Sequence, residues 1–515
     1  MMADMIYRGS ARNENLFQAL CAAKKLHGNK AAVEDIARKP VSIGTLIWKS
    51  RFLGALLEDS LASGTAPIGV MLPTSIAECT TFFGLVGIDR IPAMINFSAG
   101  SSAILAACDG AGVTEVITAH KFIEQGKLEA LEYAMLSRGF HLIYLEELKQ
   151  NGSIRTILVG FFRNLRKCMP RRSSDSAAVI LFTSGSEGRP KAVMLSHHNI
   201  LSNIRQVLSL LAVTPQDTIF NALPMFHSFG LGMGTLMPLI AGARVFFYPS
   251  PLHYRTIASL CYDTNATILF GTDTFLAGYA KVAHPYDFFN LRFAVCGAEK
   301  LRDSTRMTWM DKFGVRLLEG YGATEASPVL ACNTPMYNRP GTVGKMLPGI
   351  TYRLDPVPGL SEGARLRVKG DNILMGYWDV HRGKGQELAA PEDGWYDTGD
   401  VVTVDADGFI TICGRVKRFA KIGGEMVSLP QIEAVLTQYF PDRFFAVIAR
   451  QGGSKGEELV VYYSGDDLEV GHVTEVLRTA GIGELAIPKK YRKVVELPRL
   501  GSGKIDYNAL IIHSE

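Results

Sequence analysis

The sequence lacks the patterns of a disulfide-stabilised, zinc-binding or membrane-spanning protein. Its eight cysteines are scattered and no two form a C-x-x-C pair, which favours a reduced chain over a disulfide framework or a structural zinc site. No run of 18 apolar residues occurs, and the longest uncharged apolar stretch, 229–243, contains five glycines and prolines. The N-terminus has no charged-then-apolar leader pattern. We therefore expect a cytoplasmic protein.

An excess of charge of either sign is also missing. The formal net charge is +4, from 54 basic and 50 acidic residues, which gives no reason to expect nucleic acid as a partner. What the chain does have is length and apolar content. It has 515 residues, of which 47% are hydrophobic, so it can bury a large core in more than one domain. Helix and strand patterns alternate along most of it, which predicts an α/β fold.

One basic amphipathic segment departs from that alternation. Residues 154–172, IRTILVGFFRNLRKCMPRR, place apolar side chains on one helical face and arginines and lysines around them. One interpretation is a helix that lies on an anionic membrane surface, which would make the protein peripheral at the inner face of the cytoplasmic membrane. The other is a surface helix packed on the core, with solvated basic residues. The residues leave both open.

The nine residues 183–191, TSGSEGRPK, have the composition of a phosphate-binding loop. Backbone N–H groups and hydroxyls can donate to phosphate oxygens, and a lysine adds positive charge. The loop stands between two expected strands, 177–182 and 191–196, whereas a Walker A loop leads directly into a helix. An ordinary polar hairpin turn is the alternative interpretation. The candidate phosphate-binding residues are Thr183, Ser184, Gly185, Ser186, Gly188 and Lys191.

Three later segments favour the phosphate interpretation. EGYGATEASP (319–328) follows an apolar strand and offers an aromatic ring for a base, a hydroxyl for a phosphate and a carboxylate for Mg²⁺. GWYDTGD (394–400) ends in Asp400, which is suited to ribose hydroxyls. LPRLGSGKIDY (497–507) places Lys504 on a Gly-Ser-Gly approach. Together they indicate a nucleotide site built from distant parts of the chain.

In this order and spacing, the segments resemble the adenylate-forming superfamily of acyl-CoA synthetases, peptide-synthetase adenylation domains and luciferases. The resemblance covers essentially the whole chain. LFTSGSEGRPK, ALPMFHSFGL, CGAEKL, GRVKRFAKIGGEMVSL and LGSGK are similar, more closely, to the acyl-[acyl-carrier-protein] synthetase half of the bacterial bifunctional 2-acylglycerophosphoethanolamine acyltransferase/acyl-ACP synthetase. Ser186 and Glu187, where the superfamily commonly has two threonines, follow that pattern. No histidine has an aspartate five residues on, so the acyltransferase motif H-x-x-x-x-D is missing and we expect a stand-alone synthetase.

The resemblance implies an architecture and a reaction. The fold would be α/β, with a large N-terminal domain (1–414) of stacked β-sheets, helices and a small β-barrel-like module, and a small mobile α+β C-terminal domain (415–515). With ATP and Mg²⁺, the enzyme would activate a medium- to long-chain fatty acid as acyl-AMP, release pyrophosphate, and pass the acyl group to a pantetheine thiol. Acyl carrier protein is the expected acceptor and coenzyme A the alternative. A non-catalytic relative that binds nucleotide or acyl ligand is a third possibility.

The resemblance also implies roles for individual residues. Thr324 would contact the α-phosphate, and Glu325 would hold Mg²⁺. His227 would lie near the substrate carboxylate and Lys504 would reach it and the α-phosphate, although a core histidine and a solvated tail lysine are the plainer interpretations of each residue taken alone. The remaining assignments are Gly297, Ala298, Glu299, Tyr321 and Gly322 beside adenine, Asp400 and Arg415 at the ribose, Lys417 as the hinge, and Gly423 and Gly424 along the pantetheine channel.

Two further groups concern the acyl chain and the acceptor. Phe229, Leu231, Met233 and Phe275 are candidates for an apolar acyl pocket, and could equally be plain core. The basic run PKKYRK (488–493) is a candidate dock for an acidic carrier protein, with a solvated basic loop as the alternative. Its charged residues are Lys489, Lys490, Arg492 and Lys493.

Overall fold

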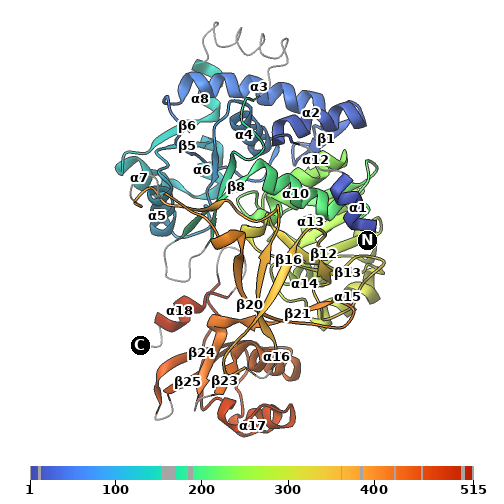
Figure 1. Ribbon diagram of the computed structural model, residues 1–515, viewed down its shortest axis with the longest axis vertical. Helices are drawn as coiled ribbons and strands as arrows, with labels where there is room; N and C mark the ends of the chain where they lie inside the picture. Colours follow the sequence, from blue (N-terminus) through green and yellow to red (C-terminus); the bar gives the residue numbers. More distant parts are fainter. Residues whose placement is uncertain are drawn as a thin grey trace. The chain divides into compact units, whose positions relative to one another are not determined.

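The computed structural model describes the chain in nine stretches: 2–9, 13–151, 170–183, 190–360, 362–382, 387–422, 425–453, 456–499 and 505–512. The chain forms two compact units (Figure 1). The first unit contains residues 1–350 and 369–394, and the second unit contains 351–368 and 395–515. The predicted domain boundary at 414/415 stays a prediction.

The first unit contains a nine-stranded sheet whose central strands are parallel. Pairing is parallel from β1 through β10, β9, β11 and β12 to β13, and antiparallel at both ends of the sheet. The parallel strands are short, apolar and almost entirely buried, as expected of a sheet covered on both faces. In spatial order the strands are β15 (Lys345–Met346), β14 (Val329–Cys332), β13 (Leu317–Gly322), β12 (Phe293–Cys296), β11 (Ile268–Gly271), β9 (Thr218–Asn221), β10 (Arg244–Phe247), β1 (Ala31–Glu34) and β2 (Val41–Ser42).

An eight-stranded sheet forms the other half of the first unit. The two strands predicted beside the glycine-rich loop are confirmed as an antiparallel hairpin of β7 and β8, in which Thr183 is opposite Lys191. The core under this sheet is apolar, and Val116 and Ile180 within it are fully buried. In spatial order the strands are β19 (Leu388–Ala389), β18 (Gly376–Trp378), β8 (Lys191–Ser196), β7 (Ala177–Thr183), β4 (Pro92–Met94), β3 (Ile68–Val70), β5 (Glu115–Thr118) and β6 (His141–Tyr144).

Helices cover the sheets of the first unit. Figure 1 shows α2, α3 and α4 packed together, and each of the three contacts the other two. Ser196 is the N-cap of α10, and its hydroxyl accepts a hydrogen bond from the Asn199 amide (3.0 Å). The helices are α1 (Met2–Gly9), α2 (Leu16–His27), α3 (Ile43–Ser60), α4 (Ile76–Gly87), α5 (Ser101–Ala111), α6 (His120–Gly126), α7 (Glu129–Ser137), α8 (Leu145–Asn151), α10 (His197–Leu208), α11 (Ser228–Leu231), α12 (Met237–Ala241), α13 (Tyr254–Asp263), α14 (Asp273–Val282) and α15 (Asp303–Phe313).

The described residues of the second unit form two sheets and three α-helices. A four-stranded sheet runs in the order β16 (Thr351–Pro356), β17 (Ala364–Lys369), β20 (Tyr396–Val404) and β21 (Ile410–Arg415). The other sheet carries apolar cores built on alternating residues of its long central hairpin, such as Val461 and Val460. Its strands are β23 (Glu425–Ser428), β22 (Phe419–Ile422), β25 (Gly456–Ser464), β24 (Phe444–Gly453) and β26 (Lys490–Lys493), and the helices are α16 (Leu429–Tyr439), α17 (Val470–Thr479) and α18 (Tyr507–Ile512). The predicted fold class, a large α/β part with sheets and a small α+β C-terminal part, is confirmed.

Residues 154–169 of the basic amphipathic segment (154–172) lie outside the described residues. At its C-terminal end, the amides of Arg171 and Arg172 donate to the Asp89 carboxylate at 3.0 and 3.1 Å. Within the stretches that the structure describes, no helix combines the length and the apolar character needed to cross a bilayer. Both interpretations of this segment, a helix on a membrane surface and a surface helix packed on the core, therefore stay open.

Candidate active site

Four loops of the first unit leave the same edge of the nine-stranded sheet. They follow β9, β11, β12 and β13, which are parallel neighbours, so their carboxyl ends meet there. Ligands of open α/β sheets bind outside the carboxyl ends of the strands. Several predicted residues of the first unit lie on these loops: His227 after β9, the range 297–299 after β12, and Thr324 and Glu325 after β13. Tyr321 and Gly322 are the last residues of β13, and Lys191 is the first residue of β8.

The loop after β9 is held by the buried side chain of Asn221. Its amide nitrogen donates to the Gly230 carbonyl (3.2 Å) and lies 3.2 Å from the Thr235 hydroxyl, while its oxygen accepts from the Leu223 amide (3.1 Å). A Cβ at Gly234 would overlap this amide, so glycine is required where the helix passes it. Residues 232–236 form a π-helical turn, a distortion often found at functional sites.

His227 is the N-cap residue of α11. Its Nδ1 accepts a hydrogen bond from the Phe229 amide (3.4 Å), so a neutral His227 in this arrangement carries its proton on Nε2. The next residue, Ser228, is buried, and its hydroxyl lies 3.2 Å from the Thr324 hydroxyl. This contact joins the loop after β9 to the turn η3 (Thr324–Ala326) after β13. The structure thus brings His227 and Thr324 to neighbouring positions.

The loops after β11 and β12 are fastened to each other. The Glu299 carboxylate accepts from the Thr274 amide (2.9 Å), and Asp273 accepts from the backbone and the side chain of Arg302 at 3.0 and 2.5 Å. Ala298 has a positive φ of 66°, which turns the chain sharply after β12. At Gly297 a Cβ would lie 3.0 Å from a Phe229 ring atom, so this turn comes close to α11.

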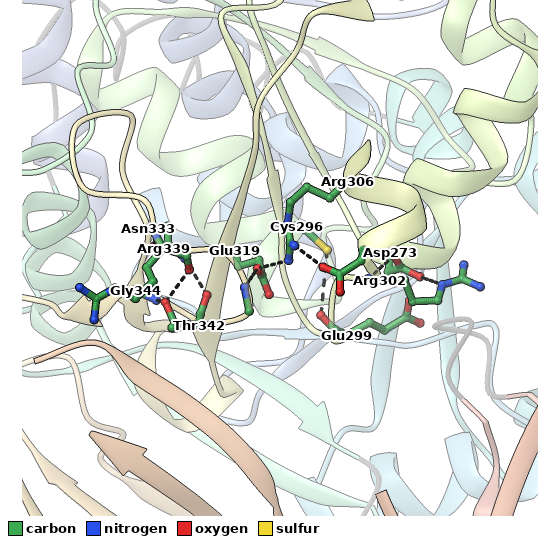
Figure 2. A network of polar contacts seen from close by, with 12 residues as sticks. Asp273, Cys296, Glu299, Arg302, Arg306, Glu319, Asn333, Arg339, Thr342 and Gly344 are labelled. Atoms are coloured by element: carbon green, nitrogen blue, oxygen red, sulfur yellow. Dashed lines mark hydrogen bonds and ion pairs between the residues drawn. The ribbon is translucent and has the colours of Figure 1, made fainter. Parts of the chain in front are cut away.

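Figure 2 shows the polar network beside these turns. The buried carboxylate of Glu319, two residues before Tyr321 on β13, accepts from the Arg306 guanidinium (2.8 Å) and from the Gly341 amide (3.0 Å). Burial raises the pKa of Glu319, and the Arg306 charge and the Gly341 hydrogen bond oppose that rise. Asn333 continues the network by holding the 333–344 loop. Tyr321 therefore projects from a strand that α15 and this loop fix in place.

Lys191, Tyr377 and Glu325 form a chain of contacts across the two sheets. The Lys191 ammonium lies over the Tyr377 ring, 4.8 Å from its centroid. The Tyr377 hydroxyl donates to Glu325 Oε1 at 2.9 Å. Lys191 is exposed, Tyr377 half-buried and Glu325 buried. The contacts bring the lysine of the predicted phosphate loop and the predicted Mg²⁺ carboxylate to one aromatic ring.

The donors present fit a magnesium ion that is completed by substrate. Mg²⁺ is usually bound in such sites by one or two carboxylates, by phosphate oxygens and by waters. Glu325 is a hard oxygen donor with lone pairs beyond the one that Tyr377 uses. Across the described stretches, no group of three or more histidine, cysteine, aspartate or glutamate side chains could hold a metal without substrate. The fit is therefore to a cation that arrives with a polyphosphate.

In the second unit, Asp400 and Arg415 are cross-strand partners on β20 and β21. Arg415 Nε lies 3.1 Å from Asp400 Oδ1, and the Asp400 side chain is 6% exposed while that of Arg415 is 68% exposed. The buried carboxylate thus has a charge partner on the neighbouring strand, and most of the arginine side chain is exposed. Lys417 follows in a single 3-10 turn, η5 (Val416–Arg418).

The turn that holds Lys417 is anchored through its neighbour Arg418. The Arg418 guanidinium lies 2.6 Å from Glu433 on α16 and over the ring of Tyr507 on α18, at 3.6 Å. The Tyr507 hydroxyl donates to the other Glu433 oxygen (3.2 Å). Burial raises the pKa of Glu433, against the opposing effect of the Arg418 charge. The chain directly after the predicted hinge is therefore firmly tied inside the second unit.

A family model described as AMP-binding enzyme matches residues 22–378. The chain belongs to the AMP-binding enzyme family. Among curated members, a feruloyl-CoA synthase of Amycolatopsis sp is 31% identical over 345 residues, which cover 64% of this chain and 68% of that protein. The medium-chain fatty-acid–CoA ligase of Escherichia coli (strain K12) is 30% identical over 348 residues, covering 64% of this chain and 60% of that protein.

Two solved structures of similar fold span nearly the whole chain of this AMP-binding enzyme. ATP-bound MatB from Rhodopseudomonas palustris is 26% identical, with a TM-score of 0.82 over 97% of this chain and 98% of that one. O-succinylbenzoate coenzyme A synthetase (MenE) from Bacillus subtilis, in complex with ATP and a magnesium ion, is 20% identical, with a TM-score of 0.80 over 97% and 100% of the two chains. The second likeness bears on the fold alone.

Several predicted site residues of this AMP-binding enzyme lie outside the described stretches. They comprise most of the glycine-rich loop, the proposed channel glycines and the proposed catalytic lysine. Their roles stay predictions, as do those of the described site residues. The predicted site residues outside the described stretches are Ser184, Gly185, Ser186, Gly188, Gly423, Gly424 and Lys504.

The candidate acyl-pocket residues are buried on three elements of the first unit. Phe229 and Leu231 lie on α11, Met233 on the π-helical turn and Phe275 on α14, and each is at most 9% exposed. Phe229 packs edge-on against Phe270, with ring centroids 5.4 Å apart. Burial of this kind suits both an acyl pocket and plain core, so the pocket stays a prediction.

The candidate carrier-protein dock is partly neutralised within the second unit. Lys490 pairs with Glu458 and Lys493 with Asp467, both at 2.8 Å, and the Arg492 guanidinium lies over the Tyr462 ring. These residues form β26 at the edge of the sheet, in parallel pairing with β25. The run thus offers an acidic partner less net charge than its sequence suggests.

Sequence reasoning missed Tyr377, Ser228 and Glu319. Tyr377 stands in a short Gly-Tyr-Trp strand whose local sequence has no phosphate or metal pattern. Ser228 directly follows His227, and that adjacency is the one local sign that could have drawn attention to it. Glu319 begins the EGYGATE segment, where it reads as a surface carboxylate until Arg306 is placed beside it.

Proposed function

We propose that the protein is an AMP-forming acid–thiol ligase that activates a fatty acid and transfers it to coenzyme A. The observation that carries the proposal is the convergence of the predicted catalytic groups of the first unit. Ser228 links the His227 loop to Thr324, and Tyr377 links Lys191 to Glu325. The fatty-acid–CoA ligase among the relatives supports the substrate class.

In the first step, a carboxylate oxygen of the fatty acid attacks the α-phosphorus of ATP. The new oxygen–phosphorus bond forms as the bond to the β-phosphate oxygen breaks, and pyrophosphate leaves with the bonding electrons. Charge grows on the phosphoryl oxygens, so preformed donors lower the barrier most. We assign Thr324 to the α-phosphate, and Thr183, the glycine-rich loop and Lys191 to the β- and γ-phosphates.

His227 and Lys504 would bring the carboxylate and the α-phosphate together. A proton on Nε2 of His227 can be donated to one carboxylate oxygen while the other oxygen attacks. Lys504 would offset the charge of both reacting groups. A magnesium ion held by Glu325 and the phosphates would neutralise the departing pyrophosphate.

The residues assigned to the nucleoside come from separate parts of the chain. We assign Asp400 to the ribose hydroxyls with Arg415 beside it, and the range 297–299 with Tyr321 and Gly322 to the adenine. In the second step, the thiol loses its proton to solvent and its sulfur attacks the acyl carbonyl carbon. The carbon–sulfur bond of the thioester forms, the bond from that carbon to the phosphate oxygen breaks, and AMP leaves with the bonding electrons. Rotation at Lys417, with Gly423 and Gly424 along the pantetheine arm, is proposed to separate the two steps.

Acyl carrier protein is the second candidate acceptor, and one observation favours it. The segment LFTSGSEGRPK with Ser186-Glu187, together with the hinge segment GRVKRFAKIGGEMVSL, follows the pattern of acyl-[acyl-carrier-protein] synthetases. Against it, the relatives reported above are named for CoA thioesters. The ion pairs of Lys490 and Lys493 also leave the proposed dock with less free charge. We therefore place coenzyme A first.

The experiment that tests the proposal supplies ATP, Mg²⁺ and fatty acids of graded chain length, and then one acceptor at a time. Pyrophosphate release that depends on the fatty acid supports adenylation. Formation of acyl-CoA with coenzyme A, identified by mass, supports the first acceptor, and formation of acyl-carrier protein alone supports the second. If no fatty acid elicits pyrophosphate or AMP, the chain is not the proposed ligase.

A further inference from the structure

Tyr377 contacts one residue from each of the two sheet regions of the first unit: Lys191 on β8 and Glu325 in the turn after β13. It lies on β18, which pairs antiparallel with β8, and it stands opposite Val193. Side chains two residues apart on a strand share a face, so Lys191 is the diagonal neighbour of Tyr377 on that face. The register of the sheet thus sets the Lys191 ammonium over the ring.

The other side of Tyr377 reaches the turn after β13. Leu374 lies three residues before Tyr377, and its amide donates to the Glu325 carbonyl (2.8 Å). This hydrogen bond fixes the backbone of the turn after β13. The Tyr377 hydroxyl then donates to Glu325 Oε1 (2.9 Å), which fixes the carboxylate itself. A hydrogen bond of this kind orients a metal-binding carboxylate, and its loss typically weakens metal binding 10- to 100-fold.

We propose that Tyr377 is a positioning residue with two separable actions on a cation–polyphosphate ligand. Its hydroxyl orients Glu325 for the divalent cation, and its ring holds Lys191 where it meets the phosphates. The inference rests on the proposed function for the identity of that ligand, because ATP with Mg²⁺ is the polyphosphate that an adenylating enzyme uses. Neither action requires Tyr377 to touch the reacting atoms.

The two actions are separated by the variants Tyr377→Phe and Tyr377→Leu. Phenylalanine keeps the ring beneath Lys191 and removes the hydroxyl, whereas leucine removes both. Tyr144→Phe is the matched control, since the Tyr144 hydroxyl also donates to a glutamate, Glu132 Oε1 at 2.6 Å. Tyr144 belongs to β6, the edge strand at the far side of the same sheet.

The readout is binding, which is independent of turnover. The non-reacting analogue α,β-methylene-ATP is titrated without metal by calorimetry, and Mn²⁺ is then titrated into the complex and followed by electron paramagnetic resonance. For Tyr377→Phe we expect unchanged metal-free nucleotide affinity and a Mn²⁺ dissociation constant raised about tenfold. For Tyr377→Leu we expect the same loss for Mn²⁺, and metal-free nucleotide affinity weakened about two- to fivefold. Tyr144→Phe should match the wild type in both titrations.

Two results from the variants would overturn the proposal. One is a Mn²⁺ dissociation constant in Tyr377→Phe equal to that of Tyr144→Phe, and the other is an equal weakening of metal-free nucleotide binding in both Tyr377 variants. A wild-type chain that binds no nucleotide also overturns it. A wild type that binds nucleotide and shows the expected variant pattern, but releases no pyrophosphate with any acid, contradicts the proposed function and leaves this inference standing.

Discussion

The hydroxyl of Ser228 lies 3.2 Å from the hydroxyl of Thr324, and this contact joins loops that follow two different strands of one parallel sheet. Ser228 is buried, so its hydroxyl has few other directions in which to bond. The pair fixes the side chain of Thr324 before any ligand arrives. A hydroxyl held in this way suits transition-state stabilisation, because it need not reorganise during the reaction.

Removing the Thr324 hydroxyl should slow adenylation. We expect Thr324→Ala to lower kcat for fatty-acid-dependent pyrophosphate release about 10²- to 10³-fold, the usual cost of one lost transition-state donor. Thr324→Ser should retain most activity, since it keeps the hydroxyl. Ser228→Ala should have a smaller effect. Equal activity in Thr324→Ala and Thr324→Ser would remove Thr324 from the proposed mechanism.

Asp400→Asn should weaken ATP binding with little change in kcat, since ribose contacts act equally in the ground and transition states. We expect the KM for ATP to rise about tenfold, the effect of roughly 1.4 kcal/mol. The control is 2′,3′-dideoxy-ATP, which lacks the hydroxyls that Asp400 is proposed to hold. Wild type and Asp400→Asn should bind this analogue alike, and a difference as large as that seen with ATP would place Asp400 elsewhere.

The pair of Arg306 and Glu319 should contribute to stability as a unit. Arg306→Ala leaves a buried carboxylate without its charge partner, a change that typically costs about 3–5 kcal/mol. Adding Glu319→Gln removes the stranded charge, so the double variant should recover part of that loss. Urea unfolding of the single and double variants measures the coupling. Additive losses would mean that the two side chains do not act together.

The buried carboxyl group of Glu78 should make the stability of the folded state depend on pH. Its side chain is buried in α4, its Oε2 has no hydrogen-bond partner among the residues described, and burial raises its pKa well above the ordinary value. A raised folded-state pKa favours the protonated form. The folded state therefore loses stability relative to the unfolded state as pH rises above the unfolded pKa of about 4.3.

Glu78→Gln should remove that dependence, because glutamine is neutral at every pH. We expect the variant to be more stable than the wild type by about 1–3 kcal/mol at pH 8, and similar to it near pH 4. Urea unfolding at the two pH values provides the measurement. A variant that is less stable than the wild type at pH 8 would contradict the assignment of Glu78 as a buried, unfavourable charge.

Local patterns in the sequence predicted the elements, and long-range pairing supplied the site. The strands beside the glycine-rich loop and the Ser196 cap depend on neighbouring residues, so they could be predicted. The contact of Lys191 with Tyr377 depends on β18 returning to pair with β8 from far along the chain. Nothing in the residues around either partner specifies that pairing.

The division of strands between the two units also depends on long-range pairing. The structure groups residues 351–368 with 395–515 in one compact unit, and the pattern of short strands after residue 340 does not specify that grouping. Short strands with frequent glycine and proline carry little information about which neighbours they pair with. The ion pairs of Lys490 and Lys493 could not be predicted for a similar reason, since their acidic partners lie on other segments.

The most direct test of the central claim follows an oxygen atom from the acid to the nucleotide. The protein is incubated with ATP, Mg²⁺, coenzyme A and a fatty acid whose carboxylate carries ¹⁸O, and the AMP produced is analysed by mass spectrometry. Attack of the carboxylate on the α-phosphorus predicts AMP that contains one ¹⁸O atom, in step with acyl-CoA formation. Unlabelled AMP, or ADP and phosphate in place of AMP and pyrophosphate, would contradict adenylation.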